Sequence, residues 1–569
     1  MQHTNQSASI EIGGITSINE HGIATQDTLA PLKIRTVGSG WYEGFNPVVA
    51  MSAKLVVMVM VAILVTMPEL SGRVLEALKT TTLTMFAGWY TYLLFAFLVF
   101  SLGLACLPVA GRIRLGPDGS TPDHSTYSWL AMMFCAGIGS GSLAFAVSEP
   151  ISHFLNNPDL LEGSVAAGEN VTMTSALRFT FLHWGLSAWA TYAVVGLALG
   201  LACYRSGQPM TMRSGLVPLF GKCLEGAFGH AIDVISILAI IAGVTTSVVL
   251  GIEQICSGLS VLTGSQFFAH NADNPSLVAL LTALVFATAI TIASVISGVE
   301  RGVKWVSQAG LALAIVVFAA FVIFGSGTRF FAVFLNGVSE YLSTFAVQST
   351  TLYDPNTSDT ARAQRDWQDA WTIFYWAWWI AFAPFVGMFV ARISRGRTLR
   401  EFILGVMLAP TVMCFLWFAG TGGSALILEL GGAANGAILS AEHAYRIYET
   451  VDIMLAPSIA IVLKAVLVLF FLILIVSCST AAIIAIKSIG AAGSDLAETP
   501  FHSILWAFVI AANTGAVMVV GGVGSIRDVM IVSAVPSSVI IALMVPSAAV
   551  MIRIAVQREK HALANVVEV

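Results

Sequence analysis

Hydrophobic and polar positions alternate along this chain on the scale of whole helices. Apolar runs long enough, at about 20 residues, to cross the ~30 Å hydrocarbon core of a bilayer as α-helices recur from residue 48 to residue 552. We predict twelve membrane spans, with short polar segments between most of them. They cover residues 48–68, 84–107, 126–149, 174–203, 231–262, 276–297, 306–326, 371–393, 402–429, 455–486, 503–524 and 528–552. The stretch 328–370 is too polar to span, but it contains an amphipathic piece, FFAVFLNGVSEYLSTFA, typical of a helix at the membrane surface.

Composition agrees with an all-α polytopic membrane protein. Of 569 residues, 57% are hydrophobic and only 10% are charged, and the mean hydropathy is +0.84. A soluble protein needs more charge than this on its surface. The net charge of −5 is small, and no basic patch indicates nucleic acid as a partner. The sequence has no Walker A motif, H-E-x-x-H motif or strand–glycine–helix loop, so neither ATP-driven transport by this chain nor an enzyme is indicated.

The polar ends divide the chain into a tail of residues 1–45, a transporter domain of residues 46–554 and a short tail of residues 555–569. The first tail lacks an apolar segment, so the first span is expected to direct membrane insertion. Most of the 27 lysines and arginines lie in the tails and in the even-numbered connections. Because positive charge marks the cytoplasmic side, we predict that both termini are cytoplasmic.

Three spans contain residues that interrupt a helix. The third, WLAMMFCAGIGSGSLAFAVSEP, contains Gly137, Gly139 and Gly141, and the eighth contains Pro384. Such interruptions free backbone groups, which in transporters can bind an ion or a polar substrate group. Tight helix packing through the GxxxG spacing is the alternative for the glycines.

The tenth span is interrupted by the polar run of residues 477–480, SCST, within a strongly apolar segment. Its hydroxyls could coordinate a small cation, or they could simply bond to the carbonyl four residues earlier in the same helix. The seven cysteines show no C-x-x-C spacing, and most lie in apolar runs. We therefore interpret them as small buried hydrophobic residues, with neither a disulfide framework nor a metal cofactor expected.

Aromatic residues gather on two spans. At 100° per residue, Trp184, Trp189 and Tyr192 share one side of the fourth span, while Trp378 and Trp379 lie about two turns inside the eighth, beside its proline. Tryptophan is also common at membrane interfaces, but a position two turns deep fits that role poorly. Several indole faces in an uncharged cavity suit a quaternary ammonium, because ring faces attract cations and this cation cannot donate hydrogen bonds.

Two glutamates and two histidines in or beside spans are candidates for a functional role. Glu149 precedes a proline at the end of the third span, where we expect water to solvate it. His153 and His183 border spans, and for each of them a hydrogen-bonded structural role is favoured over a proton relay. Glu253 lies within the fifth span, with either a coupling role or a structural ion pair open to it.

The segment FYWAWWIAFAPFVGMFVARISRGRTLREF resembles the signature of the betaine/choline/carnitine transporter family. The segments NPVVAMSAK, AGIGSG followed by SEP, HWGLSAWATYAVVGLAL and GVERGVKWVS agree with that family, so the resemblance covers about residues 45–552. It implies twelve helices in a LeuT-like fold, with an inverted repeat of spans 3–7 and 8–12, and homotrimers in the bacterial inner membrane. The implied function is secondary active import of a quaternary-ammonium or sulfonium compatible solute by alternating access. Glycine betaine, carnitine, choline and dimethylsulfoniopropionate are the candidate substrates.

The resemblance also implies a substrate site. Its residues here would be Trp184, Trp189, Tyr192, Trp378, Trp379 and Phe382, with backbone groups of Gly137, Gly139 and Gly141. Phe382 stands where the family often has a tryptophan, which leaves a smaller face on the exit route. Gly141 stands where choline carriers can have an acidic residue. Its presence favours a zwitterion whose carboxylate faces the glycine amides.

Sodium is the coupling ion that the resemblance favours. One site would use Cys135 and Ile138 with the pair Ser477–Cys478, and a second would use Thr246 and Phe385. A thiol is a poor ligand for sodium, so Cys478 weakens the first set. A sodium-independent exchanger and a proton-coupled choline transporter are therefore kept as alternatives, and a channel or osmosensor as a different class.

Overall fold

The computed structural model describes residues 29–137, 139–269, 276–297, 304–494 and 500–567. The regular structure of these ranges is helical, apart from two isolated bridges, Val37–Glu43 and Arg114–Thr398. The long helices are α1 Pro47–Thr66, α2 Pro68–Cys106, α3 Thr126–Gly137, α7 Asn170–Trp184, α8 Leu186–Gly200, α10 Ala227–Thr263, α11 Leu277–Ile296, α12 Lys304–Ala320, α13 Phe330–Gln348, α14 Asp359–Gln368, α15 Phe374–Arg392, α16 Leu399–Leu430, α19 Pro457–Gly490 and α20 Pro500–Val567. The short helices are α4 Ser140–Ala144, α5 Ser148–Leu155, α6 Pro158–Glu162, α9 Val217–Phe220, α17 Ala437–Ser440 and α18 Arg446–Met454.

Eleven helical stretches in the described ranges are long and apolar enough to cross a membrane. The expected third span does not count among them, because it is divided into α3, α4 and α5. The expected fourth span is also divided, into α7 and α8. The last two expected spans lie within α20, as the stretches Pro500–Gly521 and Gly524–Glu559. The amphipathic piece predicted near the surface forms α13.

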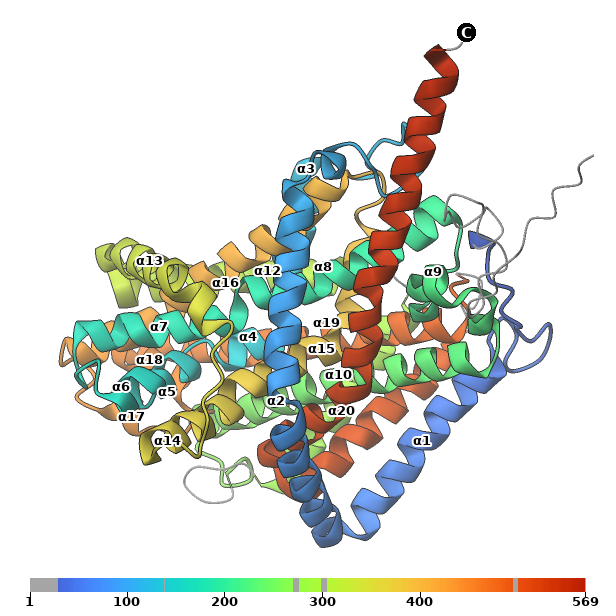
Figure 1. The fold of residues 1–569 in the computed structure, drawn as a ribbon. Coiled ribbons are helices and arrows are strands. Elements are labelled where there is room, and N and C mark those ends of the chain that lie inside the picture. Colours follow the sequence, from blue (N-terminus) through green and yellow to red (C-terminus); the bar gives the residue numbers. More distant parts are fainter. Residues whose placement is uncertain (1–28, 138, 270–275, 298–303, 495–499, 568–569) are drawn as a thin grey trace, which may run out of the picture.

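The helices that carry the aromatic residues lie at the centre of the molecule. α15 packs against α8 and α10, and α10 packs against α19. Figure 1 shows α2 and the red C-terminal end of α20 crossing this central stack. Small residues permit the close approach of α8 and α15: a Cβ added to Gly387 would lie 2.4 Å from Val195 Cγ1, and one added to Gly196 would lie 2.7 Å from Val390 Cγ2.

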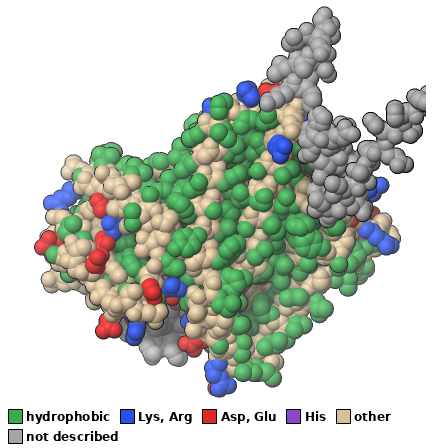
Figure 2. Space-filling view, viewed as in Figure 1, with side chains coloured by type: hydrophobic (Ala, Val, Ile, Leu, Met, Phe, Trp, Pro, Cys, Tyr) green, Lys and Arg blue, Asp and Glu red, His purple; other side chains and the backbone are tan. Residues whose placement is uncertain are grey.

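The outer surface agrees with a membrane protein. Figure 2 shows apolar side chains spread over the face formed by α1, α2 and α20, with Lys, Arg, Asp and Glu mainly at its margins. Leu55 of α1 and Met85 of α2 are among the large apolar side chains exposed on the outside of the protein. A contiguous apolar surface of this kind needs lipid to cover it.

The arginine-rich turn after α15 is held against the start of α3 and leads into the cap of α16. Arg397 donates hydrogen bonds to Thr126 Oγ1 (3.0 Å) and to the carbonyl of His124 (2.7 Å), which holds the turn against the start of α3. Thr398 and Glu401 then form a capping box that satisfies free N–H groups at the start of α16.

Candidate functional site

The break in the third span is held by side chains of its neighbours. Ile138 lies outside the described residues, and the chain resumes at Gly139 before α4. Trp417 Nε1 donates to the carbonyl of Ser142 (3.0 Å), and Thr421 Oγ1 donates to that of Ala146 (3.0 Å), both from α16. The third span is therefore broken as predicted, and these two backbone acceptors are satisfied by side chains. The interruptions predicted in the eighth and tenth spans are wrong, because α15 stays helical through Pro384 and α19 stays helical through residues 477–480.

A second break, which the sequence analysis did not predict, divides the fourth span at Gly185. Its φ and ψ are −93° and −149°, outside the helical region. The break frees two carbonyls, and each accepts an indole N–H: that of His183 from Trp379 Nε1 (2.8 Å) and that of Trp184 from Trp189 Nε1 (3.2 Å). The helical wheel of an unbroken fourth span was therefore wrong, although the aromatic residues it grouped do meet.

The predicted box residues form a contiguous set of rings. The ring of Trp379 lies 5.1 Å from that of Trp184 and 6.1 Å from that of Tyr192, both edge to face. Trp189 meets Tyr192 edge to face at 5.4 Å. Trp378 stacks on Trp379 at 5.6 Å with an interplanar angle of 2°. All five side chains are at most 7% exposed, so they form a buried cluster in which rings meet through their faces and edges.

Gly141 and Phe382 both contact Trp378. A Cβ added to Gly141 would lie 2.3 Å from the Trp378 ring, so this position accepts only glycine without a shift of the ring. The Phe382 ring meets that of Trp378 edge to face at 6.1 Å, and it fills the space beside Gly243 of α10. The indole N–H of Trp378 is buried and has no hydrogen-bond partner in the described part of the chain.

Glu149 is the residue whose role the sequence analysis missed. We expected it near water, but it is 0% exposed. Trp184 Nε1 donates to its Oε2 at 2.8 Å, and the Tyr375 hydroxyl donates to the same oxygen. His183 Nδ1 and His153 Nε2 lie 2.8 Å and 3.3 Å from its Oε1. The carboxylate thus orients a box tryptophan from outside the box, and the sequence shows no sign of this because the partners come from three separate helices.

Two of the residues considered for the first sodium site, Ser477 and Cys478, lie on different sides of α19. Ser477 lines a cavity of about 70 Å³ beside α12, with Val306, Ser307 and Gly310. The thiol of Cys478 faces the side chain of Ser247 on α10. Ser247 also accepts, at its carbonyl, a hydrogen bond from Ser140 Oγ (2.9 Å) at the start of α4. Of this pair, Cys478 is thus linked through α10 to the glycine segment; Cys135 lies on α3, and its side chain is not among those described.

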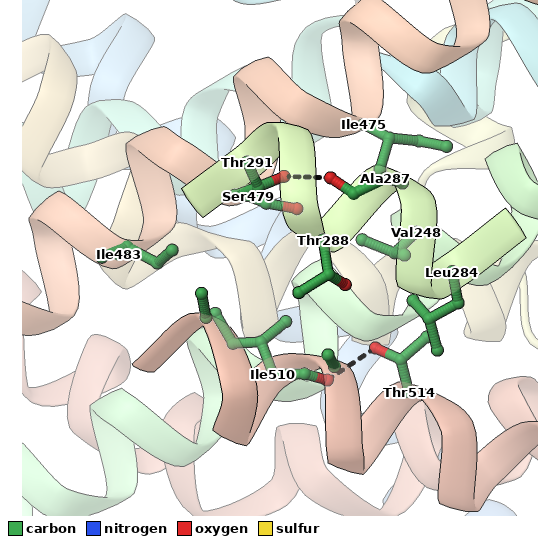
Figure 3. Close-up of a pocket in the computed structure, with 12 residues that line it drawn as sticks. Val248, Leu284, Ala287, Thr288, Thr291, Ile475, Ser479, Ile483, Ile510 and Thr514 are labelled. Carbon is green, nitrogen blue, oxygen red and sulfur yellow. Dashed lines mark hydrogen bonds between the residues drawn. The ribbon is translucent and has the colours of Figure 1, made fainter. Parts of the chain in front are cut away.

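The neighbouring hydroxyls face elsewhere. Ser479 lines a cavity of about 20 Å³ between α10, α11, α19 and α20, room for about one water molecule. Figure 3 shows that Thr291 and Thr514, at this cavity, bond to the carbonyls of their own helices. These hydroxyls therefore lie at a different cavity from the one that Ser477 lines.

The second pair considered for sodium lies on α10 and α15. Thr246 Oγ1 donates to the carbonyl of Ala242 on its own helix (3.2 Å), and Phe385 meets Phe382 edge to face at 5.9 Å. The Thr246 oxygen keeps a lone pair after donating, so it can still serve as an acceptor or ligand.

The fold and the site define a polytopic helical membrane protein with a buried cluster of aromatic rings beside two broken spans. The family model for the betaine/carnitine/choline (BCCT) transporters matches residues 47–557. The chain belongs to this family.

Among similar proteins, the glycine betaine transporter OpuD of Bacillus subtilis is 35% identical over 467 residues, 81% of this chain and 85% of that protein. A glycine betaine transporter of Acinetobacter baylyi is 33% identical over 511 residues, 89% of this chain and 73% of that protein. The osmo-independent choline transporter BetT1 of the same organism is 31% identical over 504 residues, 88% of this chain and 91% of that protein.

Proposed function

We propose that this chain is a secondary active transporter that imports a zwitterionic quaternary-ammonium or sulfonium compatible solute, of the glycine betaine type, by alternating access. The observation that carries the proposal is the contiguous set of rings of Trp184, Trp189, Tyr192, Trp378 and Trp379. Ring faces attract a methylated cation by about 0.5–2 kcal/mol each, and they offer nothing to strongly hydrated ions. Betaine and choline carriers among the relatives agree with this class of substrate.

The unpartnered indole N–H of Trp378 supports a zwitterion over a plain cation. A buried donor without a partner is costly, and a ligand acceptor is one way to satisfy it. A substrate carboxylate beside the glycine segment would supply that acceptor. Choline has only a hydroxyl there, which makes a weaker bond than a charged acceptor.

We further propose that transport is coupled to sodium and that the transporter works as a homotrimer in the bacterial inner membrane, with both termini in the cytoplasm. The charge distribution supports the orientation, and the family supports the trimer and the coupling ion. Sodium-independent exchange and proton coupling are the competing mechanisms, because a thiol at Cys478 is a poor ligand for sodium.

The test is uptake into liposomes that contain the purified chain. Labelled glycine betaine, carnitine, choline and dimethylsulfoniopropionate are compared with and without an inward sodium gradient. The proposal expects saturable betaine uptake that the sodium gradient drives, with weaker uptake of choline. Uptake that needs only substrate on the opposite side would establish an exchanger instead, and uptake that follows a proton gradient would establish proton coupling.

A Trp378→Phe variant tests the proposed carboxylate contact. It keeps a ring face but removes the N–H, so betaine affinity should fall while choline affinity changes less. Equal losses of affinity for betaine and choline would show that the Trp378 N–H does not bind the substrate carboxylate.

A further inference from the structure

Glu149, His153 and His183 form a compact cluster beside the aromatic box. Glu149 and His153 lie four residues apart on α5, a spacing that places both on one face of a helix, and His183 comes from α7. One ligating atom from each lies within 4.8 Å of the other two. All three side chains are 0% exposed.

Hydrogen bonds around this cluster already orient its ligating atoms. Glu149 Oε2 accepts from Trp184 and Tyr375, which leaves Oε1 for the two imidazoles. The far nitrogen of His183, Nε2, lies 3.0 Å from Thr372 Oγ1, so Nδ1 faces the carboxylate. Metal sites have this organisation, in which outer hydrogen bonds fix both the ligating carboxylate and the ligating imidazole.

Charge gives a second reason for a cation at this position. A carboxylate taken wholly out of water is costly unless a positive partner accompanies it. The buried guanidinium of Arg527 supplies part of this charge from beyond ion-pair distance. The groups that converge on Oε1 itself are two imidazoles, which are neutral unless they take up a proton. A divalent cation between these three atoms would compensate the carboxylate, while both imidazoles stayed neutral as metal ligands require.

We propose that Glu149, His153 and His183 bind a divalent transition metal, of which Zn²⁺ is the one the ligands fit best. Two imidazoles and one carboxylate are a three-ligand set that zinc accepts, with a fourth position left open. Zinc bonds of about 2.0–2.2 Å in a tetrahedral site place ligand atoms about 3.3 Å apart. The 3.3 Å between His153 Nε2 and Glu149 Oε1 already matches this spacing. The 2.8 Å between His183 Nδ1 and Oε1 must lengthen by roughly half an ångström. The imidazole stays neutral because its proton is then held on Nε2, which donates to Thr372 Oγ1, while Nδ1 is free to ligate the metal.

Metal binding at this cluster would reach the substrate site through one side chain. The carboxylate that ligates the metal also holds the indole of Trp184. This consequence rests on the proposed transport function, whereas metal binding itself does not. Binding is therefore measured first, on the protein without substrate.

The experiment uses the purified, untagged full chain after treatment with a chelator. Zn²⁺ is titrated against a chromophoric competitor, and Co²⁺ is added separately to record its visible absorption. We expect one tight site per chain and the intense Co²⁺ bands of a four-coordinate site. His153→Phe should weaken binding at least about tenfold, because one of three ligands is lost, while its ring can still pack against Phe179, Trp367 and Trp371.

His443→Phe is the matched control. His443 is a buried histidine that contacts Phe145 at 5.1 Å, and it lies outside the cluster. Burial, together with the positive charges of Arg527 and Arg446, lowers the pKa of His443 to about 3, so it is a neutral imidazole like the ligands. This variant should bind Zn²⁺ as the unaltered chain does.

Two results would overturn the proposal: an unaltered chain that binds no Zn²⁺ at micromolar concentration, or equal loss of binding in the two histidine variants. If the melting temperature of His153→Phe is below that of the unaltered chain, metal binding is measured on His153→Gln instead. Normal betaine uptake by a chain that binds no metal would reject this site and leave the proposed transport function intact. Metal binding by a chain that shows no betaine uptake would reject the proposed transport function and leave this site intact.

Discussion

At the scale of single residues, the sequence identified the aromatic residues of the candidate site but not the contacts that hold them. Trp184, Trp189 and Trp379 stand out in the sequence because they gather on two apolar spans, and Trp379 lies about two turns inside its span. Their indole N–H groups bond to Glu149 and to the carbonyls of Trp184 and His183, which no periodicity reveals. A ring can be predicted from the residue type and its depth, whereas a partner on another helix depends on the packing of the whole bundle.

Trp379 should contribute most to substrate affinity, because it contacts Trp184, Tyr192 and Trp378. Trp379→Ala removes one ring face, worth about 0.5–2 kcal/mol for a methylated cation, so apparent betaine affinity should fall roughly 2- to 30-fold. Uptake kinetics in liposomes give the measurement. Trp376→Phe, at a fully buried ring on the same helix and outside the predicted box, is the control and should leave affinity unchanged. An unaltered affinity in Trp379→Ala would remove this residue from the site.

Gly141 should tolerate no side chain. In Gly141→Ala the new Cβ would meet the Trp378 ring at 2.3 Å, so the ring must move or the helices separate, at about 1–3 kcal/mol. We expect uptake to fall strongly while the protein still assembles in the membrane. Gly139→Ala is the control two residues away, because open space surrounds its added Cβ. Equal uptake by the two variants would show that Trp378 need not stay against the glycine segment.

At the scale of elements, one of the two breaks in the third and fourth spans could be predicted. Three glycines within five residues predict the break in the third span. The fourth carries a single glycine, Gly185, and a lone glycine in a span is most often a packing residue. The need for glycine at this position is visible only in the packed structure. A Cβ at Gly185 would lie 2.5 Å from the carbonyl oxygen of Phe181 and 2.8 Å from the hydroxyl of Tyr341.

The broken third span should depend on the side chains that satisfy its carbonyls. Thr421→Val keeps the shape of the side chain but removes the hydroxyl that donates to the carbonyl of Ala146. A buried carbonyl left without a partner costs about 1–3 kcal/mol, so the melting temperature in detergent should fall. Thr411→Val on the same helix should be neutral or stabilising, because the buried Thr411 hydroxyl has no partner in the described ranges. Similar melting temperatures for the two variants would contradict this account of the break.

At the scale of the whole molecule, the apolar runs correctly predicted an all-helical membrane protein with many spans, of which eleven are found in the described ranges. Length and hydropathy decide whether a helix can cross the bilayer, and both are properties of the local sequence. What they could not show is which face of each helix turns inward. Ser477 and Cys478 are neighbours in the chain, yet one lines a cavity beside α12 and the other meets Ser247 of α10. That difference depends on helix rotation, which the packing of α10, α12 and α19 decides together.

The burial of the box predicts a carrier and not an open pore. An open conduction path would expose the residues that line it, but the five box side chains are at most 7% exposed, with the indole of Trp184 held by Glu149. Substrate must therefore wait for a conformational change, and liposomes that contain the chain should show saturable uptake that accumulates betaine above its outside concentration. The measurement is the betaine concentration inside the liposomes over time under an inward sodium gradient, with protein-free liposomes as the control. A betaine flux that grows linearly with betaine concentration and stops at equal concentrations would establish a channel, because only coupling to a second gradient can move the substrate uphill.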